Sequence, residues 1–296
     1  MKYAIAIDIG GTNTRVALIN DKYEILERVQ FVTDVDHPEI TLGQIKETIE
    51  KFDKDIVGVG MSCPGPLDLI EGKILTTPNL HGKWQGLCVT KELEKLINKP
   101  VYLENDANLA ALAEAVIGEG KDYNIVQFLT VSTGLGAGLV IDKKIFQGAH
   151  GFANEVANVC MKHNGPQHGS IYPGGIEAIS SGTAIEQRSM KAGFQVDHAG
   201  EVNDLALAGN PEAKEIMSEA KLYLANFIAG IQAYIDPEIV ILGGSVALKI
   251  PGFVEEVEAL VKSKVYPVVS PYVKVRKSTL SEDSGLLGSA CLVFTK

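Results

Sequence analysis

The pattern of apolar and polar positions begins with two apolar runs, residues 5–9 and 16–19, joined by a short polar turn. Two such runs on either side of glycines predict a β-hairpin. The glycines let the backbone take conformations closed to other residues, and without a Cβ they let a ligand approach the main-chain N–H groups. We therefore expect a binding surface at this turn, made by Gly10, Gly11, Thr12, Asn13 and Thr14.

The chemistry of the first turn suits a phosphate chain. A concave row of N–H and hydroxyl donors binds phosphate oxygens, and Asp8 stands at the end of the first strand, where its carboxylate can hold a hydrated Mg²⁺. A tight glycine hairpin with a capping aspartate has the same pattern. Both interpretations stay open on the turn alone.

The next elements continue an α/β pattern. We predict a strand at residues 23–32, a helix at 39–52 and a buried strand at 56–61. Two irregular segments, residues 62–68 and 76–84, are rich in turn-forming residues, and such loops at strand ends often line clefts. Within these loops we select Gly65 and Asn79 as candidate substrate-binding residues.

A candidate catalytic aspartate follows the next strand. After a helix at residues 87–97, the strand at 101–103 leads into Glu104, Asn105 and Asp106, which begin an alanine-rich helix that extends to about residue 117. A carboxylate in a first helical turn is favoured by the helix dipole, which keeps it deprotonated and able to accept a hydrogen bond. Helix capping is the alternative role for Asp106.

The second half repeats the opening pattern. A strand at residues 125–131 precedes a turn that contains Thr133, Gly134 and Gly136, and a return strand follows at 139–141. Two similar hairpins predict two related lobes that grip one phosphate chain. After a long helix at residues 211–235, a buried strand at 239–242 ends in Gly243, Gly244 and Ser245. These glycines let a flat group such as adenine approach the backbone, and a plain βα turn is the alternative.

Length and composition add the domain organisation. A chain of 296 residues with 46% hydrophobic content favours two domains. We predict a small domain at residues 1–118, joined by a C-terminal helix at 284–296, and a large domain at 119–283. A net charge of −10 argues against nucleic-acid partners. With no membrane-spanning stretch, no room for a signal peptide and four scattered cysteines, we expect a cytoplasmic protein with reduced thiols.

These motifs together resemble the ROK family of sugar kinases, which belongs with actin, hexokinase and the heat-shock chaperone ATPases. The resemblance implies two ribonuclease-H-like α/β domains with a cleft between them. It also implies phosphate loops at residues 8–14 and 132–138, an adenosine site that includes residues 243–245, a sugar-binding Asn105 and a catalytic Asp106. By the same resemblance, residues 148–155 make Glu155 a sugar ligand, and residues 176–182 make Glu177 a second one.

The sequence departs from the family pattern where many relatives bind a structural Zn²⁺. Asn158 stands at the position of the family's zinc-binding histidine, and the three cysteine positions hold His168, Ser170 and Gly175. Four-coordinate zinc cannot be held by this set. We therefore expect no structural zinc, with an improvised site made by Cys160, His163 and His168 as the alternative.

The resulting hypothesis is an ATP-dependent kinase that phosphorylates the 6-hydroxyl of an aldohexose. Asp106 takes the hydroxyl proton while Mg²⁺ and ATP present the γ-phosphate. Because Asn158 is smaller than histidine, the sugar site has room for a substituent at C1 or C2, as in N-acetylmannosamine or a β-glucoside. The alternatives from other classes are a sugar-responsive regulator without catalysis and a chaperone-like ATPase. We also expect a homodimer.

Overall fold

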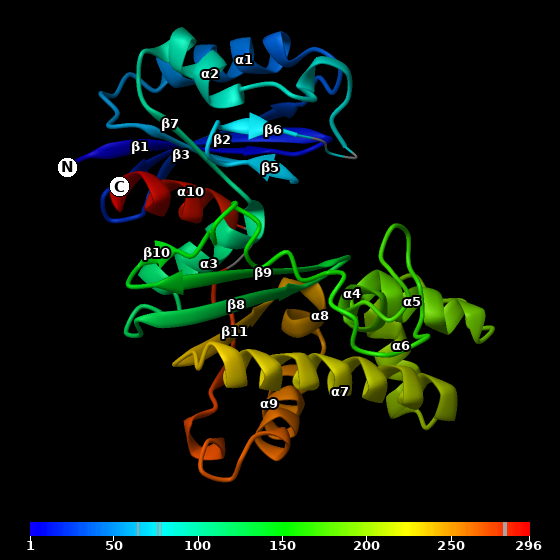
Figure 1. Cartoon of the computed structure of the whole chain (residues 1–296). Coiled ribbons are helices and arrows are strands. Elements are labelled where there is room, and N and C mark those ends of the chain that lie inside the picture. Colours follow the sequence, from blue (N-terminus) through cyan, green and yellow to red (C-terminus); the bar gives the residue numbers. More distant parts are fainter. Residues whose placement is uncertain (64, 76, 78, 281–282) are drawn as a thin grey trace. The chain divides into compact units, whose positions relative to one another are not determined.

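The computed structural model describes residues 1–63, 65–75, 77, 79–280 and 283–296. The chain divides into two compact units (Figure 1). Unit 1 comprises Met1–Ile117, Lys143–Ala153 and Leu280–Lys296, and unit 2 comprises Gly118–Asp142 and Asn154–Thr279. The domain limits given above remain a prediction. The two units differ from them in three places: residues 143–153 belong with unit 1, the C-terminal part of unit 1 begins at Leu280, and Gly118 belongs with unit 2.

The sheet of unit 1 has the strand order β3-β2-β1-β4-β7. Its strands are β1 (Tyr3–Ile9), β2 (Asn13–Asn20), β3 (Ile25–Val32), β4 (Val59–Ser62) and β7 (Val101–Glu104). β1 pairs antiparallel with β2, which confirms the predicted hairpin, whereas β1, β4 and β7 run parallel. The strand predicted from residue 56 begins only at Val59. Parallel strands end at the same edge of the sheet, so Asp8, Ser62 and Glu104 lie in register there.

Helices cover both faces of this sheet. One apolar cluster joins Ile5, Ile7 and Ile9 of β1 to side chains of α1 and α2, and the other face packs against α10, drawn red in Figure 1. A Cβ on Gly60 would lie 2.0 Å from the carbonyl oxygen of Ser289, so only glycine lets α10 approach β4 this closely. The other elements of unit 1 are α1 (Pro38–Lys51), β5 (Leu67–Asp68), β6 (Lys73–Ile74), η1 (Gly82–Trp84), α2 (Val89–Ile97), α3 (Asp106–Val116), β10 (Lys144–Ile145) and α10 (Ser284–Phe294).

Unit 2, like unit 1, has an antiparallel hairpin whose first strand also pairs with a parallel strand. Four strands follow in the order β9-β8-β11-β12, with β8 antiparallel to β9 and parallel to β11. They are β8 (Ile125–Val131), β9 (Leu135–Ile141), β11 (Ile239–Gly243) and β12 (Val275–Lys277). The helices are α4 (Ile176–Ser180), α5 (Gly182–Lys191), α6 (Ala199–Leu207), α7 (Pro211–Tyr234), α8 (Gly244–Lys249) and α9 (Phe253–Lys264), with a 3-10 turn η2 (Ser270–Tyr272).

The long helix α7 illustrates why local signals succeed here. The Asn210 side chain accepts a hydrogen bond from the Ala213 N–H at 2.9 Å, and Pro211 occupies the first helical turn. Buried residues along its length pack into the core of unit 2, including Ile216, Leu224 and Ile228. The predicted helix is confirmed, and so is the α/β class. Among the described residues, no helix has both the length and the apolar character that crossing a membrane requires.

Candidate active site

The first glycine turn is closed and tightly packed. The Gly10 N–H donates to the Asn13 carbonyl at 3.0 Å, which closes the turn between β1 and β2. A Cβ on Gly11 would lie 2.5 Å from the Cβ of Asn79, so Gly11 lets Asn79 pack directly against the turn. The structure therefore brings together two residues that the sequence analysis selected from separate segments.

Asp8 lies next to this turn and is paired with Arg15. The Arg15 Nη2 and Nε atoms donate to Asp8 Oδ2 at 2.6 and 3.0 Å, because the two residues face each other across β1 and β2. Oδ1 of Asp8 takes no part in this pair. Carboxylate oxygens are the ligands that Mg²⁺ prefers, so the donor chemistry here fits a hydrated magnesium ion.

Asn105 and Asp106 begin helix α3 directly after β7. Asn105 Oδ1 accepts the Ala107 N–H at 2.9 Å, so Asn105 caps the helix and Asp106 is its first residue. Asp106 Oδ1 accepts the same N–H at 2.8 Å. Its side chain is exposed to water, yet surrounding protein atoms desolvate the carboxylate and, with the negative charge of Asp8, raise its pKa. The expectation that the helix dipole keeps Asp106 deprotonated stays a prediction, and desolvation and Asp8 act against the dipole.

Two neighbours complete this edge of unit 1. A Cβ on Gly65 would lie 3.6 Å from Asn105 Nδ2, so the loop after β4 passes beside the capping residue. Cys63 is fully buried, and burial, with Asp8 and Asp106 nearby, raises the pKa of its thiol. It is therefore an unreactive packing residue. Residues 64, 76 and 78 of the loops predicted to line a cleft lie outside the described residues.

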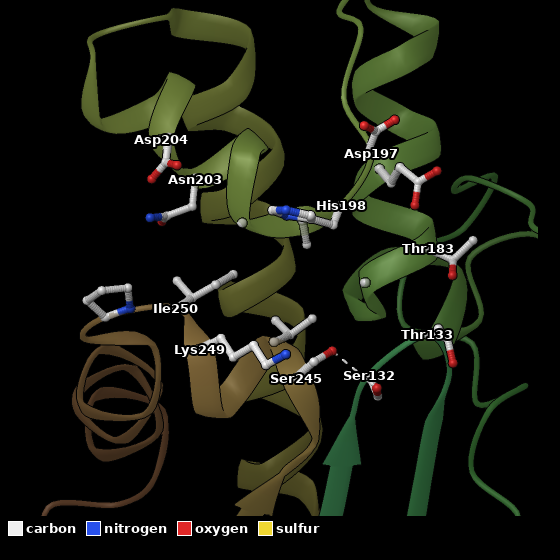
Figure 2. A pocket seen from close by; sticks show the side chains of 16 residues that line it. Ser132, Thr133, Thr183, Asp197, His198, Asn203, Asp204, Ser245, Lys249 and Ile250 are labelled. Atoms are coloured by element: carbon white, nitrogen blue, oxygen red, sulfur yellow. Dashed lines mark hydrogen bonds between the residues drawn. The ribbon is translucent and has the colours of Figure 1, made fainter.

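Unit 2 contains a pocket of about 480 Å³ at the carboxyl ends of β8 and β11 (Figure 2). The Ser132 and Ser245 hydroxyl oxygens lie 3.2 Å apart and join the turns that follow these two strands. Gly244 has φ of +84°, and a Cβ there would lie 2.4 Å from the Val131 carbonyl oxygen, so this position requires glycine. Thr133 of the second glycine turn also lines the pocket, whereas Gly134 and Gly136 are not among the lining residues.

The opposite wall of this pocket was not predicted. It comes from the N-terminus of α5 and from α6, with Thr183, His198 and Asn203 among the lining residues labelled in Figure 2. The Gly182 N–H donates to the Ser132 carbonyl at 2.6 Å, which docks α5 onto the second glycine turn. The available signal was Ser181, a serine before a helix, whose hydroxyl accepts the Ala184 N–H at 3.2 Å.

Two expected sugar ligands have other hydrogen-bond partners. Glu177 Oε2 accepts the Leu135 N–H at 2.8 Å, and a Cβ on Gly134 would lie 2.8 Å from the same oxygen, so the Glu177 carboxylate lies against the second glycine turn. Asn158 Oδ1 accepts the Tyr172 N–H at 2.7 Å. Its amide nitrogen is thus the atom that remains for a ligand. Glu155 is exposed.

The improvised metal site is not formed. Cys160 Sγ lies 3.8 Å from the Lys162 carbonyl oxygen, and His168 Nδ1 lies 3.1 Å from Gln187 Oε1. Over the part of the chain that the structure describes, no three His, Cys, Asp or Glu side chains are grouped as metal ligands. Cys160, His163 and His168 are therefore not brought together.

Each unit begins with a β-hairpin that has a glycine turn, and in each unit a parallel strand pairs with the first strand of that hairpin. This arrangement defines an α/β protein of the actin and hexokinase type. The chain belongs to the ROK family, whose model matches residues 4–296. Its fold superposes on a ROK hexokinase from Thermus thermophilus with a TM-score of 0.89 and 30% identity, over 99% of this chain and 98% of that one.

The curated relatives include both enzymes and a regulator. A glucokinase of Thermotoga maritima is 31% identical over 98% of this chain and 96% of its own length. An N-acetylmannosamine kinase of Salmonella typhi is 31% identical over 97% of each protein. A xylose repressor of Bacillus spizizenii is 26% identical over 99% of this chain and 77% of its own length.

Proposed function

We propose that this protein is an ATP-dependent sugar kinase. The observation that carries the proposal is the edge of unit 1, where Asn105 and Asp106 begin α3 next to Asp8 and the first glycine turn. Glucokinase and N-acetylmannosamine kinase are among its relatives at 31% identity. A carboxylate that can take a proton, an amide that can orient the acceptor and a turn that can receive phosphate oxygens suit the transfer of a phosphoryl group to a hydroxyl.

In this mechanism Asp106 is the general base. Its carboxylate accepts the proton of the sugar hydroxyl as the bond from that oxygen to the γ-phosphorus forms, while the bond from the γ-phosphorus to the β,γ-bridging oxygen breaks and ADP leaves. The raised pKa of Asp106 brings it closer to the pH at which a base is efficient. The Asn105 amide orients a neighbouring sugar hydroxyl. Asp8 would hold a hydrated magnesium ion, which would neutralise charge on the phosphates.

The nucleotide is assigned to unit 2. The pocket of about 480 Å³ has room for an adenosine, and Ser245 and Thr133 line it. Gly243 and Gly244 lie directly before Ser245 and pack against Phe128 and Val131, so here the missing Cβ atoms serve protein packing. Thr133, Gly134 and Gly136 present backbone donors to the phosphates. In unit 1 the turn of Gly11, Thr12 and Asn13 does the same, and the Gly10 N–H closes that turn by donating to the Asn13 carbonyl.

The sugar is proposed to be an aldohexose phosphorylated at its 6-hydroxyl, with tolerance at C1 or C2. The substrate contacts are assigned to Gly65, Asn79, Asn105, Glu155, Asn158 and Glu177. Because Asn158 Oδ1 already accepts the Tyr172 N–H, its Nδ2 is the group that donates to a substituent on the sugar. N-acetylmannosamine and β-glucosides are the modified sugars to test beside glucose and mannose.

A sugar panel tests this proposal. Turnover of each sugar with Mg·ATP is measured by ADP release, and ³¹P NMR of the product identifies the phosphorylated oxygen. If glucose is much the best substrate by kcat/KM, and Asn158→His leaves the ranking unchanged, the assignment of C1 or C2 tolerance to Asn158 is wrong. Phosphate on another oxygen contradicts the 6-hydroxyl assignment.

A regulator without catalysis is the second candidate, favoured by the xylose repressor that matches 99% of this chain. Binding of a sugar without sugar-stimulated ADP release supports the regulator, and stimulated release supports the kinase. The homodimer and the cytoplasmic location stay predictions, to be checked by light scattering and by cell fractionation.

A further inference from the structure

Glu104 is a buried carboxylate that the proposed mechanism does not use. Its residue has 0% exposed surface, yet it lies directly before Asn105 and Asp106. Burial raises its pKa, while three hydrogen bonds oppose that shift. A buried carboxylate is costly unless its oxygens are satisfied. Its presence beside the candidate base therefore calls for an explanation.

Three donors surround the two oxygens of Glu104. Oε1 accepts the Asn105 N–H and the Asn108 Nδ2 group, each at 2.9 Å. Oε2 accepts Gln147 Nε2 at 2.6 Å. The two bonds to Oε1 hold the backbone of Asn105 and the side chain of Asn108. The Glu104 carboxylate therefore fixes the first turn of α3, in which Asp106 lies.

Gln147 belongs to a different segment of unit 1, Lys143–Ala153. Its carbonyl oxygen accepts the Ala153 N–H at 3.2 Å, which closes a turn over residues 147–153. Gly148 inside this turn has φ of +71° and lies against Ala153. The bond to Glu104 therefore anchors the start of the segment that leads to Glu155.

We infer that Glu104 is a positioning residue that ties the Asn105–Asp106 turn to Gln147 in the segment Lys143–Ala153 of unit 1, so that the base keeps a fixed place within this unit. The inference rests on the proposed function. It assigns to Glu104 no contact with the substrate. Its effect is on kcat, because a base misplaced by about 1 Å can cost roughly a hundredfold in rate.

The experiment uses Gln147→Leu, Gln147→Glu and the exchange variant Glu104→Gln/Gln147→Glu. Gln147→Leu removes the donor, and Gln147→Glu sets two carboxylates against each other. The exchange variant restores an amide-to-carboxylate bond with the roles reversed. We expect kcat to fall about tenfold to a hundredfold in both single variants, with KM for ATP within about twofold, and to recover to within about threefold in the exchange variant.

Gln232→Leu is the matched control. Gln232 is 5% exposed and donates to Asp236 Oδ1 at 2.8 Å, so its loss removes a similar bond elsewhere in the chain. A similar fall in kcat in the control, or a kcat within twofold of wild type in Gln147→Leu, overturns the inference. So does an exchange variant no better than Gln147→Glu.

A second readout does not depend on sugar turnover. Amide hydrogen exchange by NMR reports the Asn105 N–H, which Glu104 Oε1 binds. We expect exchange at least about tenfold faster in Gln147→Leu and unchanged exchange in Gln232→Leu. If amide exchange at Asn105 is unchanged in Gln147→Leu, the inference that Gln147 and Glu104 together hold the Asn105–Asp106 turn is wrong, even where kcat falls. Wild-type protein that phosphorylates no sugar instead overturns the proposed function, while the exchange result still decides whether Glu104 holds the turn.

Discussion

Replacing Asp106 by asparagine removes the proposed base and little else. Asp106 Oδ1 accepts the Ala107 N–H at 2.8 Å, and an asparagine oxygen can accept the same bond. Asn105 caps the helix in both proteins. The variant should therefore keep the wild-type melting temperature to within about 2 °C, since surface changes of this kind rarely exceed about 0.5 kcal/mol.

Turnover should fall much more than stability. General-base catalysis contributes about a hundredfold to ten-thousandfold, which corresponds to roughly 2.7–5.4 kcal/mol of activation free energy at about 1.36 kcal/mol for each tenfold. Nucleotide affinity should stay within about twofold, because the amide retains the volume and the hydrogen bond of the carboxylate. The loss belongs in kcat, since the proton is transferred only in the reaction.

The pH dependence supplies an independent check. Desolvation and Asp8 raise the pKa of Asp106, so the inactive protonated form persists to higher pH than for an ordinary aspartate. Activity is lost as the pH falls through this raised pKa. Asp8→Asn removes the like charge, so the acid limb of its residual kcat/KM profile should move to lower pH.

A coupled assay of ADP release between pH 4 and 9 measures both effects. Asp55→Asn is the control for loss of a negative charge, because the Asp55 side chain is 93% exposed and pairs with Lys99 on the surface. Asp106→Asn turnover within a few-fold of wild type would remove Asp106 from the role of base. An acid limb that does not move in Asp8→Asn would refute the electrostatic part of the reasoning.

The remaining predictions concern unit 2 and zinc. Gly244→Ala should lower the melting temperature more than Gly193→Ala. Both glycines have φ near +90°, which costs alanine about 1–2 kcal/mol, but only at Gly244 does the new Cβ lie 2.4 Å from the Val131 carbonyl oxygen. Equal shifts of the two melting temperatures in calorimetry would contradict this. Glu177→Ala should destabilise by about 1–3 kcal/mol in denaturant titration, because the Leu135 N–H loses its acceptor, and Glu177→Gln should not; the reverse order would contradict it. Metal analysis of purified protein should find no stoichiometric zinc, and a chelator should leave the melting temperature unchanged, whereas one zinc per chain would show that the ligand set was misjudged.

The sequence predicts best what depends on neighbours in the chain. The hairpin turns carry glycines, and α7 carries its cap and its first-turn proline, so each signal lies within a few residues of the element that it defines. For the pocket wall from α5 and α6 the Ser181 cap indicates that a helix begins, but nothing nearby in the chain indicates where that helix docks. The wall forms because Gly182 docks on Ser132, fifty residues earlier in the sequence, and that pairing depends on the packing of the whole unit.

Electrostatic detail is lost for the same reason. A first-turn aspartate suggests a stabilised carboxylate, but the pKa of Asp106 also depends on the atoms around it and on Asp8 at the end of another strand. The sequence analysis places Glu104 directly before Asn105 and Asp106. Nothing near it in the chain indicates that its side chain binds Gln147, which belongs to a distant segment. The close contacts made at glycines are also not predictable from the sequence pattern, since nothing near Gly60 in the chain indicates that it faces Ser289.

The packing of α10 on unit 1 has a consequence for biosynthesis. Ala6, Ala17 and Ile19 form a cluster with Leu286 and Ala290, yet the ribosome makes the first three near the start and α10 after all of unit 2. At a synthesis rate of about 5–20 residues per second, tens of seconds pass before α10 covers this face of the nascent sheet. During synthesis this face is an exposed apolar surface, and unit 1 completes its core only when α10 has left the exit tunnel.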